Sequence, residues 1–316
     1  MFNRRAFLTA LGATSLAWPG LAGAANDGPV TLLLPYPGGA FDAIVRALSG
    51  PLSQALGREV AIERVPGDGG WEVLARLQAG DPASTLLADA DLTLAVKQVM
   101  GGRDFNFDSL TPVAKLTDGF SVALIAPAGA VHARWAGLVE ALAERKVKLA
   151  TTGKASAYGV AELLWGSVFK GEFEEVRAPG PQAIFDAVVG GQADLGLVTT
   201  NLLEGFNAAA TQGQAVPVMT FGAKRSPRYP DTPTLAEISG DDKNDFTIAL
   251  GLFASKAAPA DMVKTVAAAL AKAQQAPALA SAPVQKNFPI TLNDAEVLRQ
   301  SFARSLRLLT RLQGAE

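Results

Sequence analysis

The sequence predicts an α/β fold of two lobes, each built around a parallel-rich sheet. Short apolar strands alternate with amphipathic helices, and this alternation occurs twice along the chain. The length of 316 residues is sufficient for about two domains. Hydrophobic residues make up 49% of the chain and charged residues 18%, which supplies a packed core and argues against a disordered chain.

The first lobe begins with a strand–helix–strand–helix–strand pattern. Residues 30–34 form a short apolar run that stops at Pro35, so we expect a buried strand there. A helix follows, because apolar residues recur at spacings of three and four from Ile44 to Leu56, ahead of Gly57 at the C′ position. The next predicted elements are a strand, a turn, a helix and a strand over residues 60–62, 66–70, 71–78 and 85–88.

The second lobe repeats this pattern. Its predicted strands are residues 147–150, 173–176 and 195–198, and its predicted helices are residues 160–169 and 184–189. Apolar runs over residues 120–126 and 246–254 stand at the two ends of this unit. We expect these runs to cross between the lobes and to serve as a hinge. The expected lobes are residues 25–124 with 250–316, and residues 125–249.

The N-terminus has the features of an export signal in their usual order. Arg4 and Arg5 precede an apolar run that is too short to span a bilayer of about 30 Å as a helix. Residues 22–24 then read Ala-Gly-Ala, an A-x-A cleavage site. The sequence therefore predicts a twin-arginine signal peptide over residues 1–24 and a periplasmic protein without a lipid anchor. The alternative is an amphipathic N-terminal helix of the folded domain.

Composition excludes several classes of chemistry. The chain has no cysteine, which rules out disulfides, thiolate metal sites and cysteine nucleophiles. Its one histidine, His132, follows a proline-containing break, so we expect an exposed loop residue rather than a catalytic base. A formal charge of -2 and a pI of about 5.6 offer no basic surface for nucleic acid. The sequence contains neither a nucleophile elbow nor a phosphate-binding loop.

Three loops rich in glycine or hydroxyl groups precede helices at the carboxyl ends of predicted strands, where open α/β sheets bind ligands. They span residues 37–39, 153–156 and 179–181. Helix N-termini present unpaired N–H groups and a partial positive charge, so these loops suit a carboxylate or a phosphate. Pro181 fits the first helical position with Gly180 as the cap. Ser156 is a helix N-cap, a ligand contact or both.

Four charged residues near these loops have two interpretations each. Asp42 is either a first-turn acid favoured by the helix dipole or a ligand contact. Lys154 is either a solvated loop residue or the cation that meets a ligand carboxylate. Asp89 and Asp91 follow the predicted strand over residues 85–88, where they would contact a ligand hydroxyl or amino group. The two acids could also bind a hard metal ion, but the sequence offers no third ligand of matching spacing.

Several short motifs follow one another in a distinctive order. They read LPYPGG over residues 34–39 with Asp42 and Arg46, LGREV over 56–60, PGDGG over 66–70, TTG over 151–153 with Ser156, GGQAD over 190–194, RSP over 225–227 and PDTPTLAE over 230–237. This series resembles that of the Bug proteins, the extracytoplasmic solute receptors of tripartite tricarboxylate transporters. The resemblance extends over almost all of the chain that follows the signal peptide.

The resemblance implies a Venus-flytrap binding protein, with a small organic acid held between two lobes. It implies ligand contacts from Tyr36, Gly38, Gly39, Phe41 and Asp42 in the first lobe and from Thr152, Ser156, Ala178, Gly180 and Thr199 in the second. The charge arguments above add Asp91 and Lys154 to this ligand-binding set. Val198 departs from the family pattern, which places an acid at that strand end.

The sequence therefore predicts a periplasmic receptor that delivers a small carboxylate to the membrane permease subunits of a tripartite tricarboxylate-type transporter. We expect a monomer without catalytic activity, cofactor, metal or nucleic-acid partner. The aromatic surfaces of Tyr36 and Phe41, together with the acids Asp89 and Asp91, favour a monocarboxylate with an aromatic or hydroxylated body. Two alternatives stay open: a ligand-sensing receptor for a signalling partner, and a periplasmic hydrolase that uses Asp42, Asp89 or Asp91.

Overall fold

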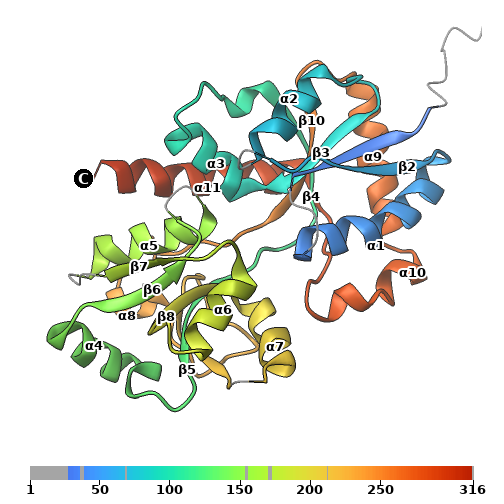
Figure 1. The fold of residues 1–316 in the computed structure, drawn as a ribbon. Coiled ribbons are helices and arrows are strands. Elements are labelled where there is room, and N and C mark those ends of the chain that lie inside the picture. Colours follow the sequence, from blue (N-terminus) through green and yellow to red (C-terminus); the bar gives the residue numbers. More distant parts are fainter. Residues whose placement is uncertain are drawn as a thin grey trace, which may run out of the picture.

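The computed structural model describes residues 28–35, 39–67, 70–153, 156–169, 173–211 and 213–314. It shows two lobes, each with one β-sheet covered by helices (Figure 1). The predicted signal peptide, residues 1–24, lies outside the described residues. Within the described ranges, no helix combines the length and the apolar character needed to span a bilayer.

The first lobe is built on a six-stranded sheet. Its strands are β1 (Val30–Leu34), β2 (Val60–Arg64), β3 (Thr85–Ala90), β4 (Leu110–Lys115), β10 (Leu250–Ser255) and β11 (Asn293–Asp294), in the order β11-β4-β10-β3-β1-β2. The first three strands are parallel, whereas β10 is antiparallel to both of its neighbours, β3 and β4. The carboxyl ends of β1, β2 and β3 therefore lie along one edge of the sheet.

Helices cover both faces of this sheet. They are α1 (Gly39–Leu56), α2 (Trp71–Ala79), α3 (Asp91–Met100), α9 (Ala260–Ala273), α10 (Pro277–Ala280) and α11 (Ala295–Gln313), with 3-10 turns η2 (Phe107–Ser109) and η4 (Pro283–Lys286). Leu32 and Leu34 pack with α1 and α9, whereas Leu33 packs with α2, α3 and α11. Burial on both faces explains why β1 is an uninterrupted apolar run.

The second lobe holds a five-stranded sheet of order β7-β6-β8-β5-β9. Its elements are β5 (Val122–Pro127), η3 (Val131–Ala133), α4 (Trp135–Glu144), β6 (Val147–Thr151), α5 (Ala157–Val168), β7 (Phe173–Arg177), α6 (Pro181–Val189), β8 (Leu195–Thr199), α7 (Thr200–Ala209), β9 (Ala215–Thr220) and α8 (Leu235–Ser239). Strand β6 is parallel to β7 and β8, and β5 is antiparallel to β8 and β9. The predicted α/β fold of two lobes is confirmed, and both sheets are mixed, with parallel and antiparallel pairs of strands.

Two local predictions are wrong. Strand β3 continues beyond residue 88, because Asp89 and Ala90 pair with Gly251 and Leu250 of β10. Asp89 is thus a strand residue and does not follow the strand, whereas Asp91 directly follows β3 and starts α3. His132 is half-buried in η3 rather than exposed, with its Nε2 atom 3.1 Å from the Asp194 carbonyl oxygen.

Two crossover segments connect the lobes and are hydrogen-bonded to each other. The chain leaves the first sheet after Lys115 and returns to it at Leu250. Between these points Phe120 and Ile248 form an antiparallel bridge, with N–H···O distances of 2.9 Å in both directions. The predicted lobe boundary at 124/125 falls inside β5, and the one at 249/250 falls directly before β10.

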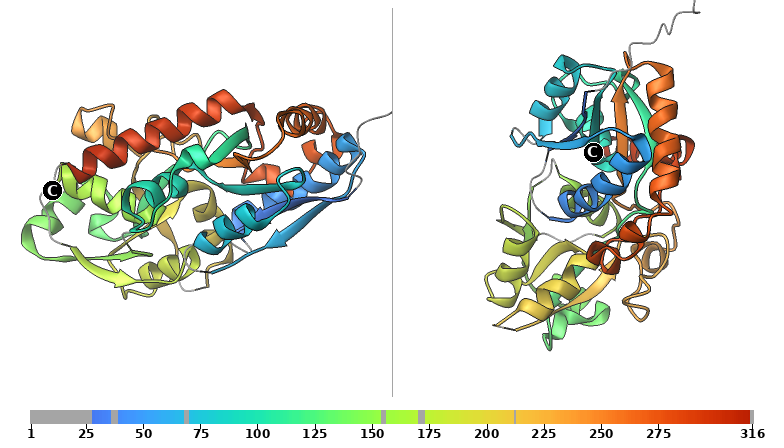
Figure 2. Two further views of the ribbon diagram at one scale, coloured as in Figure 1. Left: turned by 90° about the horizontal axis from the view of Figure 1, so that it is seen from above. Right: turned by 90° about the vertical axis from the view of Figure 1, so that its right-hand side faces the viewer.

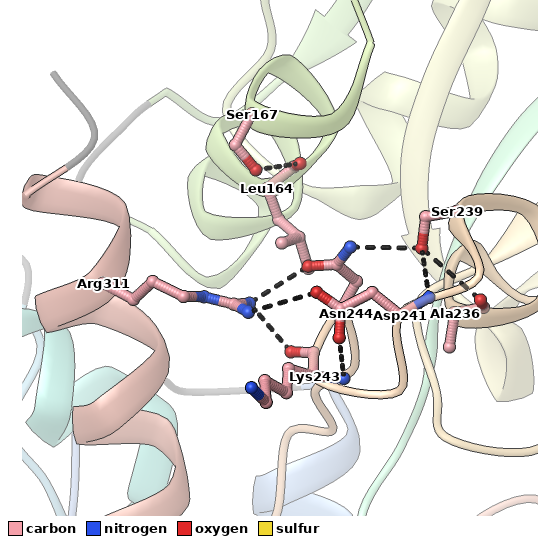
Figure 3. A network of polar contacts seen from close by, with 8 residues as sticks. All are labelled: Leu164, Ser167, Ala236, Ser239, Asp241, Lys243, Asn244 and Arg311. Atoms are coloured by element: carbon pink, nitrogen blue, oxygen red, sulfur yellow. Dashed lines mark hydrogen bonds and ion pairs between the residues drawn. The ribbon is translucent and has the colours of Figure 1, made fainter.

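Helix α11 forms a further connection between the lobes. In the view from above in Figure 2, it extends from the first lobe over the second. Near its C-terminus, Arg311 donates to the Lys243 carbonyl oxygen at 2.8 Å and to Asn244 Oδ1 at 3.1 Å, and lies 3.8 Å from an Asp241 carboxylate oxygen (Figure 3). These contacts fasten α11 to the loop between α8 and the second crossover.

Candidate functional site

Three loops of the second lobe begin at the ends of neighbouring parallel strands. The strands β7, β6 and β8 lie side by side, and the chain leaves them to enter α6, α5 and α7. The Ala178 N–H donates to the Thr151 carbonyl oxygen at 3.0 Å, which ties the first two loops together. The structure therefore brings these residues to one edge of the sheet: Thr152, Ser156, Ala178, Gly180 and Thr199.

Ser156 is the N-cap of α5, as its position in the sequence predicts. Its Oγ atom accepts from the Gly159 N–H at 3.0 Å and from the Thr152 hydroxyl at 2.7 Å, and it donates to the Gly153 carbonyl oxygen at 2.7 Å. The Ser156 hydroxyl thus makes all three of its hydrogen bonds within the protein. A ligand would have to replace one of these bonds to contact it, whereas the half-buried Thr152 oxygen keeps its acceptor capacity.

Tyr158 is a residue of this edge that sequence reasoning missed. It lies in the first turn of α5, and its side chain is hydrogen-bonded to Thr199 between β8 and α7. Burial raises the pKa of the Tyr158 hydroxyl to about 12, against the opposing effect of the hydrogen bonds with Thr199. The phenol therefore stays neutral and joins two of the three loops. No periodic pattern in the sequence distinguishes this tyrosine.

Arg177 supplies a cation at the same edge, and sequence reasoning missed it as well. Gly153 has φ of +96°, and a Cβ atom at this position would lie 2.8 Å from Arg177 Nη1. The positive φ favours glycine at this position, and the Arg177 guanidinium lies against its backbone. The Arg177 side chain is 71% exposed, and its Nε atom lies 3.1 Å from Glu175 Oε1. The placement of Arg177 depends on the parallel pairing of β7 with β6.

The start of α6 is also as the sequence predicts. Gly180 is the N-cap residue and Pro181 occupies the first turn. The Gly180 backbone is extended, and nothing lies within 4 Å of the place where its Cβ would be. The backbone at this helix N-terminus is therefore open to close approach by a ligand.

The first lobe contributes α1, whose first turn faces the second lobe. Phe41 packs against two hydrophobic clusters, and Leu202 of α7 packs against one of them. In Figure 1, the N-terminal end of α1 lies on the side of the first lobe that is turned toward the second lobe. Gly39 is the first residue of α1, and the predicted contacts Tyr36, Gly38 and Lys154 lie outside the described residues.

Asp42 is held by two arginines. Its carboxylate accepts from Arg46 at 2.5 Å and from Arg64, at the end of β2, at 2.7 Å. Burial by itself raises the pKa of Asp42, but the hydrogen bonds and charges of Arg64 and Arg46 outweigh it and lower the pKa below its usual value. Asp42 therefore orients two cations, and the cluster of Asp42, Arg46 and Arg64 carries a net positive charge.

Asp91 is wholly buried, and three donors surround its carboxylate. Oδ1 accepts from the N–H groups of Leu92 at 2.7 Å and Ala249 at 3.0 Å, and Oδ2 accepts from the Ser301 hydroxyl. Burial raises the pKa of this carboxyl despite the three hydrogen bonds. The Asp91 side chain links α3 to the second crossover and to α11, and these contacts favour a structural role over the predicted ligand contact.

Asp89 is equally buried but poorly paired. Oδ1 accepts from the Ala90 N–H at 2.7 Å, whereas Oδ2 has no hydrogen-bond partner. Burial raises the pKa of Asp89 to about 6, although the positive charge of Lys97 opposes the shift. Lys97 is itself 4% exposed, and its Nζ atom has no hydrogen-bond partner among the described residues. Across the described ranges, no three acidic or histidine side chains gather as metal ligands.

Comparison with known proteins places this two-lobed arrangement in a family. The sequence profile of the tripartite tricarboxylate transporter family receptor, TctC, matches residues 44–307. The chain belongs to this family. A relative from Pseudomonas sp. strain P51, described as the UPF0065 protein in the tcbD-tcbE intergenic region, is 26% identical over 282 residues, 87% of this chain and 82% of its own.

Solved structures share the fold of this TctC-family receptor at low identity. The periplasmic binding protein BugD has a TM-score of 0.72 and 19% identity, with 92% of this chain and 98% of that chain covered. A Rhodopseudomonas palustris protein solved with adipate has a TM-score of 0.77 and 16% identity over 92% and 98%. MatC from the same species, solved with malate, has a TM-score of 0.69 and 22% identity over 89% and 98%. The resemblance to the Bug receptors is confirmed.

Proposed function

We propose that this TctC-family receptor is a periplasmic protein that captures a small carboxylate between its lobes and delivers it to membrane permease subunits. The observation that carries the proposal is the convergence of three loops of the second lobe, each followed by a helix, at one edge of its sheet. The N–H groups at such helix starts attract an anion and need no charged side chain.

The proposed ligand contacts combine the predicted loops with the two residues that the structure adds. In the first lobe they are Tyr36, Gly38, Gly39 and Phe41; in the second they are Thr152, Lys154, Ser156, Tyr158, Arg177, Ala178, Gly180 and Thr199. Asp42 and Asp91 have protein partners that occupy their carboxylates. We therefore assign Asp42 to positioning Arg46 and Arg64, and Asp91 to the crossover.

The ligand class follows from the charges near the proposed site. The preference for a monocarboxylate depended on Asp89 or Asp91 repelling a second carboxylate. Because both side chains are wholly buried, they give no reason to exclude a second carboxylate on the ligand. The structures solved with malate and adipate support a small carboxylate as the ligand class. We propose a mono- or dicarboxylate, without catalytic turnover.

The first test is a thermal-shift screen of mono- and dicarboxylates, followed by calorimetric titration of the best compound. Arg177→Met should weaken binding of that compound by about 1.5–3 kcal/mol, the contribution of a hydrogen bond to a charged group. Arg134→Met, which removes an exposed arginine of the same lobe before α4, should bind like the wild type. Ligand should also reduce the radius of gyration in solution scattering, because closure brings the lobes together. Equal affinity of both variants, or a screen without any stabilising compound, would contradict the proposal.

Export provides a second test. If residues 1–24 are a twin-arginine signal, Arg4→Lys combined with Arg5→Lys should leave the precursor in the cytoplasm, because the pathway reads the arginine pair. Cell fractionation with immunoblotting measures the distribution. Arg134→Lys combined with Arg145→Lys is the control and should be exported normally. Normal export of the signal variant would show that another route is used.

A further inference from the structure

Helix α11 is a stiff rod whose N-terminal half is fixed to the first lobe. Its 19 residues include neither proline nor glycine, the usual causes of a kink. The Ser301 hydroxyl donates to the buried carboxylate of Asp91, and the Phe302 ring stacks on Phe107 with the ring centroids 3.5 Å apart. This half of the helix therefore moves with the first sheet.

The C-terminal half of α11 lies against the second lobe. It contacts α5, and its side chains Leu308, Leu309 and Leu312 are buried. The view from above in Figure 2 shows the helix crossing from one lobe to the other. A straight helix that is packed on both lobes couples the position of one lobe to that of the other.

Arg311 is the polar contact at the far end of this rod. It donates to the Lys243 carbonyl oxygen at 2.8 Å and to Asn244 Oδ1 at 3.1 Å, and its Nη1 atom lies 3.8 Å from Asp241 Oδ2 (Figure 3). The acceptors are fixed beforehand: Asn244 is 7% exposed and donates to Ser239 Oγ at 3.1 Å, and the Lys243 N–H donates to Asp241 Oδ1 at 2.9 Å. We call Arg311 with Asp241, Lys243 and Asn244 the α11 clasp.

The α11 clasp restricts rotation about the crossovers. The two crossovers meet at the bridge between Phe120 and Ile248, so the second lobe can turn about this narrow junction. Hydrogen bonds from N–H to oxygen extend over only about 2.7–3.2 Å. Because α11 does not bend easily, rotation must either separate Arg311 from its acceptors or pull Ser301 away from Asp91.

We propose that the α11 clasp limits the range of angles that the two lobes adopt in the protein without ligand. Arg311 is the positioning residue of this device, because its guanidinium joins a helix of the first lobe to a preformed loop of the second. The inference concerns the unliganded chain and does not depend on the proposed receptor function. A ligand that favours another lobe angle would have to release the clasp first.

Distances between spin labels on the two lobes test the proposal. The chain has no cysteine, so Glu140→Cys on α4 and Lys264→Cys on α9 introduce two unique labelling positions, both exposed. Double electron–electron resonance then measures the distribution of interlobe distances without ligand. Arg311→Met keeps the apolar stem and removes the donors, so the distribution should become broader. Arg307→Met, which removes an exposed arginine one turn earlier on α11, should leave it unchanged.

Two further variants make the test specific to the clasp. Asp241→Asn removes the negative charge and keeps an acceptor for the Lys243 N–H, so it should broaden the distribution less than Arg311→Met. Arg311→Lys can still donate to the Lys243 carbonyl oxygen and should restore part of the narrow distribution. Equal distributions for Arg311→Met and Arg307→Met would overturn the proposal. So would a broadening in Arg311→Met that accompanies unfolding of the last turns of α11, measured by hydrogen exchange, because the cause would then be a frayed helix. Asp241→Asn keeps the test decisive if Arg311→Met does not fold.

Discussion

Asp91→Ala is expected to destabilise the receptor by about 3–5 kcal/mol, because each buried donor left without its acceptor costs about 1–3 kcal/mol. Three buried donors lose their acceptor: the N–H groups of Leu92 and Ala249 and the Ser301 hydroxyl. Ala249 lies at the end of the second crossover and Ser301 on α11. The change therefore loosens two of the three connections between the lobes, the second crossover and α11.

Equilibrium unfolding in urea measures this loss, with Asp91→Asn as the matched control. The asparagine oxygen can still accept from the two N–H groups, and its amide can donate to Ser301. Because burial already raises the pKa of Asp91, loss of the negative charge costs little. We expect Asp91→Asn to keep most of the stability that Asp91→Ala loses. Equal destabilisation by both variants would mean that the negative charge, rather than the hydrogen bonds, holds this junction.

Asp89→Asn is expected to have the opposite effect and to stabilise the receptor at pH 7–8 by about 3 kcal/mol, from about 1.4 kcal/mol for each pKa unit. The folded-state pKa of Asp89 is about 6, above the usual value of 3.8 for aspartate. Between these values the folded protein binds more protons than the unfolded chain, so stability falls as pH rises through that window. Above about pH 6 the loss is complete. Asparagine keeps the acceptor for the Ala90 N–H and removes the charge.

Urea unfolding between pH 4 and pH 8 tests this prediction. The wild type should lose stability from about pH 4 to about pH 6, and Asp89→Asn should remove that component of the pH dependence. Asp108→Asn, at an exposed position of the same lobe, is the control and should follow the wild type. An Asp89→Asn curve parallel to that of the wild type would show that Asp89 does not titrate in this range.

Much of the fold could be predicted because its signals are local. The alternation of strand and helix patterns depends on neighbouring residues, and so do the caps at Ser156 and Gly180 with Pro181. These features identified both α/β units and the three loops that the structure brings to one edge. The order of short motifs, in turn, was sufficient to recognise the receptor family.

Only the tertiary structure decided the roles of the charged residues. Asp89 and Asp91 look alike in the sequence, yet donors from Ala249 and Ser301, far along the chain, reach Asp91 and not Asp89. Asp42 is occupied by Arg64, and Arg177 is placed by the pairing of β7 with β6. The physical reason is that the pKa and availability of a buried charge depend on desolvation and on partners from other segments. Local periodicity contains no information about those partners.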